Sequence, residues 1–324
     1  MRASRVADRF VKTILLQPRI RALLQAGRSR FDALMHCYRY GSPYYTPRYR
    51  LGPQILRKRF PTHPDARVEL HMLLCGRDFL MGLWALASWM VHSGIPTRIF
   101  IHDDGTLNRH HALTLQQVFP GSSFVSLRKA DELANSQLQG FPDCLRMRQF
   151  SPTGLKLVDF RLLSKAPIIL SLDSDVFFFD RPDEIIRRLR DSSTQPPFVF
   201  MKDVVRSYSL GEEAMNQEAG IPAPLLNTGI GLIRPDAVAF AFLEQLCRRR
   251  PEIFSDPFLA EQTAYAILAC KNGFDLLSHE YRIPNAAHHA PLVAGHYVRG
   301  IRERFWIDAV GAGHGAILGR MNPA

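Results

Sequence analysis

From residue 68 onward, short apolar runs alternate with longer segments whose apolar residues recur at helical spacing. Four of the runs are rich in Val, Ile, Leu and Phe and lack helical periodicity, which is typical of buried strands. They cover residues 68–75, 97–101, 123–126 and 168–172. One helix is expected to follow residues 76–78 and to end before Gly94, and another is expected around residues 154–164. This order predicts an α/β fold with a Rossmann-like, mixed but mostly parallel sheet flanked by helices.

The second half of the chain shows the same kinds of element less regularly. A further strand is expected at residues 198–201, and helices are expected at residues 236–248 and from about residue 257. The segment from residue 281 to the C-terminus has the composition of a loop and contains several histidines. We therefore expect no regular element in that last segment.

The first 60 residues carry all of the excess positive charge. They hold 14 Arg and Lys against two Asp, whereas the other 264 residues hold 27 basic and 28 acidic residues. Between Val6 and Met35 apolar residues recur at near-helical spacing with a break at Pro18, which predicts two short basic amphipathic helices. An irregular connector is expected at residues 40–61. Such helices either attach to an anionic membrane surface or pack on the protein, and the sequence leaves both open.

Composition limits the class of protein. With 46% hydrophobic and 22% charged residues, the chain has a globular composition. Its five cysteines are scattered and never form a C-x-x-C pair, which argues against a disulfide framework and a zinc site. No apolar run approaches the roughly 18 residues that span a bilayer, and the N-terminus lacks the apolar region of a signal peptide. We expect a cytoplasmic protein, peripheral at the inner membrane face if the arm binds lipid, and no nucleic-acid partner.

Two carboxylates interrupt the apolar run that begins at Ile168. They are Asp173 and Asp175, with Ser174 between them. Burying unpaired carboxylates is costly, so the pair needs a cation, a hydrogen-bond network or solvent at the carboxyl end of the strand. Ligands of open α/β sheets bind at that end. Two carboxylates at this spacing suit a hard divalent cation such as Mg²⁺ or Mn²⁺, and His296 is a residue type that Mn²⁺ accepts as a third ligand.

Four features of the sequence occur together. They are a D-x-D motif after an apolar strand, an N-x-G motif followed by apolar residues, an acidic residue with Gln at the start of a late helix, and a C-terminal His-aromatic pair with a basic residue six positions after the His. In this chain they are Asp173-Ser174-Asp175, Asn227-Thr228-Gly229, Glu261-Gln262, and His296-Tyr297 with Arg302. Lys156 precedes the D-x-D motif by 17 residues. The set resembles the GT-A-fold glycosyltransferases and is most similar to glycosyltransferase family 8, over about residues 68–306.

Three positions depart from the pattern of that family. The family more often has Asp-Gln where this chain has Glu261-Gln262, and its glycine follows the His by three residues where Gly300 follows by four. The basic residue after the His is usually Lys, whereas Arg302 carries a planar guanidinium.

The resemblance implies a metal-dependent hexosyltransferase. Its donor would be a nucleotide diphosphate sugar, most often a UDP-sugar, and its acceptor a glycan or a lipid-linked molecule of the cell envelope. Mn²⁺ or Mg²⁺ would bind to Asp173, Asp175 and His296, and the catalytic residues would be Asn227, Glu261 and Gln262. The residues implied to contact the donor are Gly76, Arg77, Asp78, Lys156, Asp173, Ser174, Asp175, Gly229 and Arg302.

The resemblance also divides the chain. Residues 1–62 would form the basic arm and connector, and residues 63–324 a single catalytic domain with a nucleotide-binding half (63–210) and an acceptor half (211–324). Two other functions remain open: a non-catalytic nucleotide- or glycan-binding module of the same fold, and a sugar nucleotidyltransferase. The latter normally has a Gly-rich phosphate loop after the first strand, where this chain has one glycine, Gly76.

Overall fold

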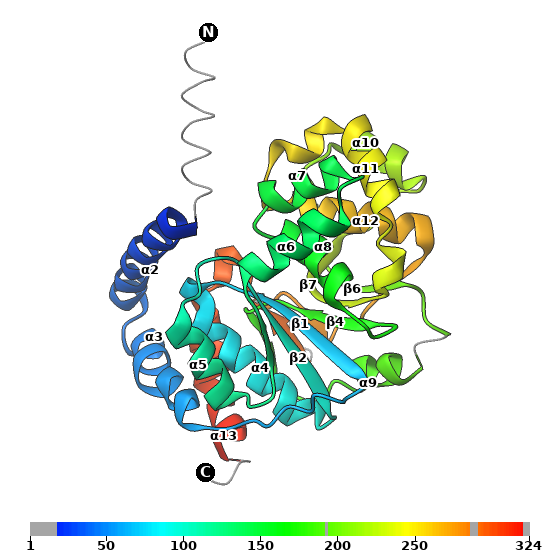
Figure 1. Cartoon of the computed structure of the whole chain (residues 1–324). Coiled ribbons are helices and arrows are strands. Elements are labelled where there is room, and N and C mark those ends of the chain that lie inside the picture. The colour runs from blue at the N-terminus through cyan, green and yellow to red at the C-terminus, as the bar shows by residue number, and fades with distance from the viewer. Residues whose placement is uncertain (1–17, 192–193, 286–290, 320–324) are drawn as a thin grey trace, which may run out of the picture.

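The computed structural model describes residues 18–191, 194–285 and 291–319. Its centre is a seven-stranded sheet with the strand order β3-β2-β1-β4-β7-β6-β8 (Figure 1). The strands are β1 (Val68–Leu74), β2 (Thr97–Asp103), β3 (Ser123–Val125), β4 (Ile169–Leu172), β6 (Phe198–Lys202), β7 (Leu226–Ile233) and β8 (Phe274–Leu276). β7 runs antiparallel to both of its neighbours, whereas the other paired strands of this sheet are parallel. The predicted α/β fold with a mostly parallel sheet is confirmed.

The sheet has a hydrophobic core on each face. Every residue of β4 and β7 is buried, as expected for central strands covered on both sides. Side chains of β1 and of α4 (Phe79–Ser93) belong to one hydrophobic cluster. Side chains of β6, α8 (Gly154–Leu163) and α12 (Ala260–Asn272) belong to a second. Polar side chains that must reach solvent or a ligand are therefore confined to the ends of the central strands.

Further helices lie around the sheet and its two hydrophobic clusters. They are η3 (Gly76–Asp78), α5 (Arg109–Val118), α6 (Leu127–Gln137), α7 (Pro142–Phe150), α9 (Asp183–Arg190), α10 (Glu212–Ala219), η5 (Pro235–Ala237), α11 (Phe240–Arg249) and η6 (Pro251–Ser255). The helix expected at residues 236–248 is thus split into η5 and α11. None of the helices among the described residues is long and apolar enough to cross a membrane.

The N-terminal part is more helical than the sequence predicted. One helix, α2 (Pro18–Tyr40), covers the second of the two expected helices and continues past it to Tyr40. The first of the two expected helices lies outside the described residues. The irregular connector expected at residues 40–61 is wrong, because α3 (Ser42–Tyr45), η1 (Thr46–Leu51) and η2 (Gly52–Arg57) follow. Each has a proline near its start, where no backbone N–H is needed.

The C-terminal segment is also more regular than expected. A second, three-stranded sheet has the order β5-β10-β9, formed by β5 (Val176–Phe178), β10 (Ala294–His296) and β9 (Tyr281–Arg282). η7 (Arg299–Ile301), η8 (Phe305–Val310) and α13 (Gly311–Gly319) complete the described chain. The loop expected from residue 281 is therefore wrong. Strand pairing returns this segment to the end of β4, where the candidate site lies.

Candidate active site

The D-x-D residues lie in the turn between β4 and β5. The backbone N–H of Val176 donates to the carbonyl oxygen of Asp173 at 3.2 Å, which closes the turn. The backbone N–H of Asp173 donates to the carbonyl oxygen of Gly229 at 2.9 Å, which ties the turn to β7. The pair of carboxylates thus stands at the carboxyl end of a buried central strand, the place that the sequence predicted.

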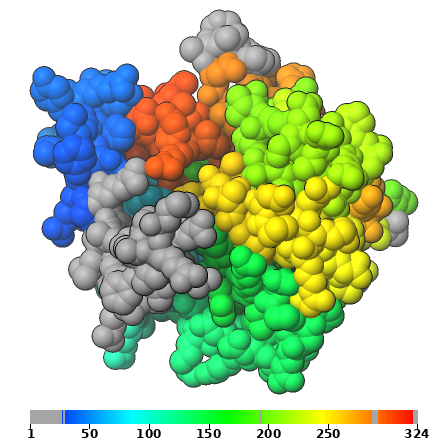
Figure 2. All heavy atoms as spheres, turned by 90° about the horizontal axis from the view of Figure 1, so that it is seen from above, coloured from blue at the N-terminus to red at the C-terminus, as the bar shows by residue number. Residues whose placement is uncertain are grey.

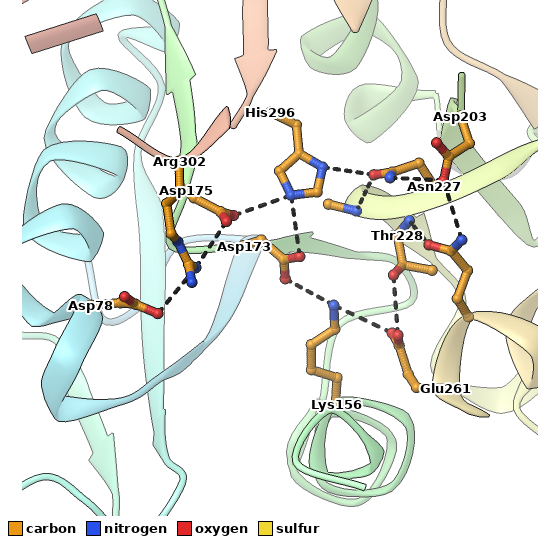
Figure 3. A network of polar contacts seen from close by, with 12 residues as sticks. Asp78, Lys156, Asp173, Asp175, Asp203, Asn227, Thr228, Glu261, His296 and Arg302 are labelled. Atoms are coloured by element: carbon orange, nitrogen blue, oxygen red, sulfur yellow. Dashed lines mark hydrogen bonds and ion pairs between the residues drawn. The ribbon is translucent and has the colours of Figure 1, made fainter. Parts of the chain in front are cut away.

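Asp173, Asp175 and His296 converge at this turn. His296 is the last residue of β10 and lies opposite Val176 of β5 in the small sheet. Its Nε2 lies 3.1 Å from Oδ1 of Asp175 and 3.7 Å from Oδ2 of Asp173 (Figure 3). One candidate ligand atom from each of the three residues lies within 4.8 Å of the others. Asp175 and His296 are buried, whereas the Asp173 side chain is 28% exposed, so the cluster opens to solvent at Asp173.

The second nitrogen of the His296 ring is fixed by Asn227. Nδ1 of His296 lies 2.8 Å from Oδ1 of Asn227, which also accepts from the backbone N–H of Gly229 at 2.9 Å. The Asn227 amide nitrogen donates to Oδ2 of Asp203 at 3.2 Å, so the amide oxygen must face His296. When the ring is neutral, its proton is therefore on Nδ1, and Nε2 presents a lone pair to the two carboxylates.

This donor set fits a divalent cation. Two carboxylate oxygens and an imidazole nitrogen are ligands that Mn²⁺ accepts, and a neighbour holding the distal ring nitrogen is typical of histidine ligands. Burial opposes the charged form of His296, but the Asp175 carboxylate outweighs it and raises the pKa of the imidazole. Burial also opposes the charge of Asp175, yet Arg302 and His296 hold the pKa of that carboxyl well below its usual range. The Asp175 carboxylate is thus available as a ligand at neutral pH.

Gly229 makes room for the His296 ring. A Cβ atom at this position would lie 2.2 Å from Nδ1 of His296, closer than any van der Waals contact. The backbone of β7 and the imidazole can therefore approach each other only because residue 229 has no side chain.

Lys156 lies on the other side of Asp173. Its Nζ, carried by α8, is 2.8 Å from Oδ1 of Asp173 and 3.3 Å from Oε1 of Glu261. Burial opposes the ammonium charge, but the two carboxylates raise the pKa of Lys156, so it stays protonated. Glu261 also accepts from the Thr228 hydroxyl at 3.1 Å. Burial raises the pKa of Glu261 to about 7, although Lys156 acts to lower it.

Arg302 connects the D-x-D turn to the segment that follows β1. Its Nη2 lies 2.9 Å from Oδ2 of Asp175 and 3.1 Å from Oδ2 of Asp78 in η3. Arg77 meets the same Asp78 carboxylate through Nε at 2.9 Å and Nη2 at 2.8 Å. Burial opposes the charge of Asp78, but Arg302 and Arg77 hold the pKa of its carboxyl below the usual value. Gly76, at the start of η3, donates its backbone N–H to Oγ1 of Thr106 at 2.8 Å.

Asp203 also belongs to the cluster, although it is not among the site residues predicted from the sequence. Besides the Asn227 amide, its Oδ2 accepts from Nε2 of Gln262 at 3.3 Å. Gln262 also donates to the carbonyl oxygen of Ser207 at 3.0 Å, and its Oε1 accepts from the backbone N–H of Thr228 at 3.3 Å. Asp203 directly follows the apolar strand β6. A carboxylate after an apolar strand is the same signal that pointed to Asp173.

The structure thus assembles most of the predicted site residues into one polar network. Asp78, Lys156, Asp173, Asp175, Asn227, Glu261, His296 and Arg302 point toward one another from elements far apart in the sequence (Figure 3). Gln262 and Gly229 contact the same network. Arg77 joins it through Asp78, Ser174 lies buried within the D-x-D turn, and Gly76 lies at the start of η3.

No protein-family model and no curated protein matches the sequence. Solved structures match the fold. A galactosyltransferase, LgtC, in complex with donor and acceptor sugar analogues, aligns with a TM-score of 0.50 and 16% identity over 76% of this chain and 96% of that chain. The apo structure of WbbM, a bifunctional glycosyltransferase, aligns with a TM-score of 0.50 and 11% identity over 79% of this chain and 52% of that chain. The chain therefore has the GT-A fold that the sequence resemblance implied.

Proposed function

We propose that this protein is a metal-dependent glycosyltransferase that moves a hexose from a nucleotide diphosphate sugar to a glycan or lipid-linked acceptor of the cell envelope. The observation that carries this proposal is the convergence of Asp173, Asp175 and His296 at the carboxyl end of β4 in a GT-A fold. In such a sheet, this end is where ligands bind. The catalytic domain is proposed to span residues 63–324, with donor binding mainly in residues 63–210.

Asp173, Asp175 and His296 are proposed to hold Mn²⁺ or Mg²⁺. When bound, the cation would neutralise charge on the diphosphate of the donor. Asn227 supports this role by keeping Nε2 of His296 turned toward the two carboxylates. Gly229 supports it by leaving the space that the ring occupies.

Lys156 and Arg302 are proposed to stabilise the leaving group. In the transfer, the bond between the anomeric carbon and the diphosphate oxygen breaks, and its electron pair leaves with the diphosphate. The acceptor hydroxyl oxygen bonds to the anomeric carbon, and its proton passes to the leaving diphosphate. The Lys156 ammonium contacts Asp173 and the Arg302 guanidinium contacts Asp175, so the D-x-D turn has a positive side chain next to each of its carboxylates. Negative charge that develops on a diphosphate bound there would be stabilised by these two side chains. Nε of Arg302 is buried without a hydrogen-bond partner in the described chain, and an unmet donor of this kind suits a phosphate oxygen.

The residues on the β7 side are proposed to bind the transferred sugar. Asn227 and Gln262 present polar groups that Asp203 orients, and hydroxyl groups of a hexose are suitable partners for such amides. Glu261 is only 2% exposed, so we assign it a role through Lys156 and Thr228 rather than direct contact with the donor. The base of the nucleotide, most often uracil, is proposed to lie near residues 76–78.

A thermal-shift panel of nucleoside diphosphates and nucleotide sugars, with and without Mn²⁺, tests the proposal. We expect stabilisation that requires both Mn²⁺ and a diphosphate, followed by Mn²⁺-dependent release of the nucleoside diphosphate from one nucleotide sugar. Binding without any turnover would favour a non-catalytic module. Formation of a nucleotide sugar from a sugar phosphate and a nucleoside triphosphate would favour a nucleotidyltransferase.

The variant Asp175→Asn provides the matched loss-of-function test. It removes a charge at the proposed metal site and keeps the shape of the side chain, so we expect Mn²⁺-dependent binding and turnover to disappear. The variant should still fold, with a lower Tm at pH 7 because Arg302 and His296 stabilise the charged carboxylate in the folded state. Asp131→Asn is the control, because Asp131 also pairs with an arginine, Arg148, and is not part of the site. Loss of folding in Asp175→Asn alone would indicate a structural carboxylate instead.

A further inference from the structure

Helix α2 turns an apolar stripe toward solvent. Its residues recur at the spacing i, i+3, i+4 and i+7, which places them on one helix face. They are Phe31, Leu34, Met35 and Tyr38, with exposed fractions of 63%, 67%, 46% and 87%. Large apolar side chains gathered in this way on a surface mark a site of interaction.

A different side of α2 packs on the protein. Cys37 and Tyr40 lie against the hydrophobic cluster that contains α4, and the Tyr40 hydroxyl donates to Oε1 of Glu303 at 3.0 Å. The helix is therefore anchored through these residues. The sequence left open whether the apolar positions pack inward or face a partner, and the stripe of residues 31–38 faces outward.

The exposed apolar surface continues beyond the helix. Of the twelve large hydrophobic side chains that are exposed in the described chain, seven lie between residues 31 and 56. The additional three are Tyr45, Tyr49 and Leu56. A surface hollow of about 380 Å³ lies in the same region and is lined by Cys37, Gly41, Ser42, Tyr45, Thr46 and Arg50. The apolar surface is thus concentrated on one short stretch of chain.

Positive charge surrounds this apolar surface. Residues 30–59 contain seven basic residues and one acidic residue, whereas residues 61–324 are close to neutral. Five of the seven basic residues are exposed, namely Arg30, Arg39, Arg50, Arg57 and Arg59. Tyrosine and arginine side chains with an apolar body and a polar end are typical of the boundary between lipid headgroups and acyl chains.

We propose that α2 docks on an anionic lipid bilayer, with the stripe Phe31, Leu34, Met35 and Tyr38 inserted at the level of the headgroups. A helix with one apolar face and basic flanks binds in this way in the plane of the membrane. A second copy of this chain is less suitable, because two faces of the same strong positive charge repel each other. Nucleic acid would match the charge but leave Leu34 and Met35 without an apolar partner.

The docking surface lies beside the proposed active site. α2 lies against η3, which contains Asp78, and Tyr40 binds Glu303, the residue after Arg302. Figure 2 shows the blue atoms of the α2 and α3 region next to the red-orange atoms of the C-terminal segment. A docked bilayer would therefore lie close to the donor site. On the proposed function, this arrangement selects an acceptor that is lipid-linked over one that is freely dissolved.

Co-sedimentation of the full chain with vesicles tests the docking surface. Vesicles of phosphatidylcholine alone are compared with vesicles that contain about one third phosphatidylglycerol. We expect binding to the anionic vesicles only, and binding about tenfold weaker or less for the double variant Leu34→Glu/Met35→Glu, which loses apolar area and gains negative charge. Ile221→Glu is the control for an exposed apolar residue outside the stripe, and its binding should match that of the wild type.

Three outcomes would overturn the proposal. Wild-type protein that binds neither kind of vesicle excludes a membrane surface. Equal binding by the wild type and the double variant excludes a role for the stripe. Self-association in analytical ultracentrifugation that the double variant abolishes, without vesicle binding, assigns the stripe to a second copy. Because sedimentation does not measure turnover, failure here leaves the glycosyltransferase proposal intact, and failure of that proposal leaves this one intact.

Discussion

Oδ1 of Asn227 lies 2.8 Å from Nδ1 of His296, and this contact sets which ring nitrogen faces Asp173 and Asp175. The orientation of the Asn227 amide is set in turn by Asp203, which accepts from its nitrogen. A chain of three polar side chains therefore turns Nε2 of His296 toward the two carboxylates, as its proposed role as a metal ligand requires. Residues that hold ligands in this way matter almost as much to a metal site as the ligands themselves.

Asn227→Ala should weaken metal binding. Without the amide, the His296 ring loses its fixed proton position and orientation, and we expect Mn²⁺ affinity to fall by about 10- to 100-fold. Isothermal titration with Mn²⁺ measures the effect. Asn216→Ala is the matched control, because Asn216 also accepts a backbone hydrogen bond but lies on α10, outside the network. Equal affinities of Asn227→Ala and the wild type would show that the ring is held by other contacts.

Gly229→Ala should displace His296. The added Cβ would lie 2.2 Å from Nδ1 of His296, so the ring or β7 must move. Overpacking of this kind typically costs about 1–3 kcal/mol of folding free energy, and we also expect Mn²⁺ binding to be lost. Chemical denaturation and Mn²⁺ titration measure the two effects. Gly211→Ala meets no atom within 4 Å and should leave both unchanged.

Glu261 should make stability depend on pH near neutrality. Burial raises the pKa of Glu261 to about 7, above the value of about 4.3 in an unfolded chain, so the folded state binds its proton more tightly. Its contribution to stability is complete below about pH 4 and is lost as the pH rises through about 7.

Glu261→Gln keeps this side chain neutral at every pH. Relative to the wild type, the variant should therefore gain stability between about pH 5 and pH 8, by about 3 kcal/mol at the upper end. Urea denaturation across this range gives the difference. Glu213→Gln, at an exposed position of α10, should give a difference that does not vary with pH. A constant difference for Glu261→Gln as well would contradict the raised pKa.

Asp78 should make stability depend on pH in the direction opposite to that of Glu261. Arg302 and Arg77 outweigh burial and lower the pKa of Asp78 in the folded state, so its contribution to stability is present above the unfolded pKa of about 3.9. That contribution is lost as the pH falls through the lower folded value. We expect Asp78→Asn to have a lower Tm than the wild type at pH 7 and a smaller further loss on acidification to about pH 3.

The exposed residue Asp236 supplies the control for this comparison. Asp236→Asn should follow the wild-type Tm at each pH. If the Tm curves of Asp78→Asn and the wild type run parallel from neutral to acid pH, Asp78 does not depend on its arginine partners in the way we describe.

The D-x-D turn could be predicted from the sequence because its signal is local. An apolar run as uniform as residues 168–172 has few placements other than a central strand, and carboxylates at its end must meet solvent or a ligand. Asp203 has the same kind of signal but stands alone after β6, and a single carboxylate after a strand is common. Its importance comes from contacts with Asn227 and Gln262, which only the folded chain brings together.

The position of His296 could not be predicted from local pattern. β10 has three residues, one of them Gly295, and so shows no alternation of apolar and polar positions. Its partner β5 is distant in the sequence. The irregular connector expected at residues 40–61 is wrong for a different reason, because the prolines of this segment stand where short helices begin.

Backbone pairing between β5 and β10 decides which sequence changes the site can tolerate. His296 is opposite Val176, and the N–H of Tyr297 donates to the carbonyl oxygen of Asp175 at 2.9 Å. Backbone hydrogen bonds between the two strands thus fix the spacing of the His296 imidazole and the Asp175 carboxylate. Most side-chain replacements nearby leave these backbone hydrogen bonds unchanged. Inserting or deleting one residue within β10 would turn the imidazole to the opposite face of the small sheet. Length in this strand is therefore a stricter constraint on the site than side-chain identity.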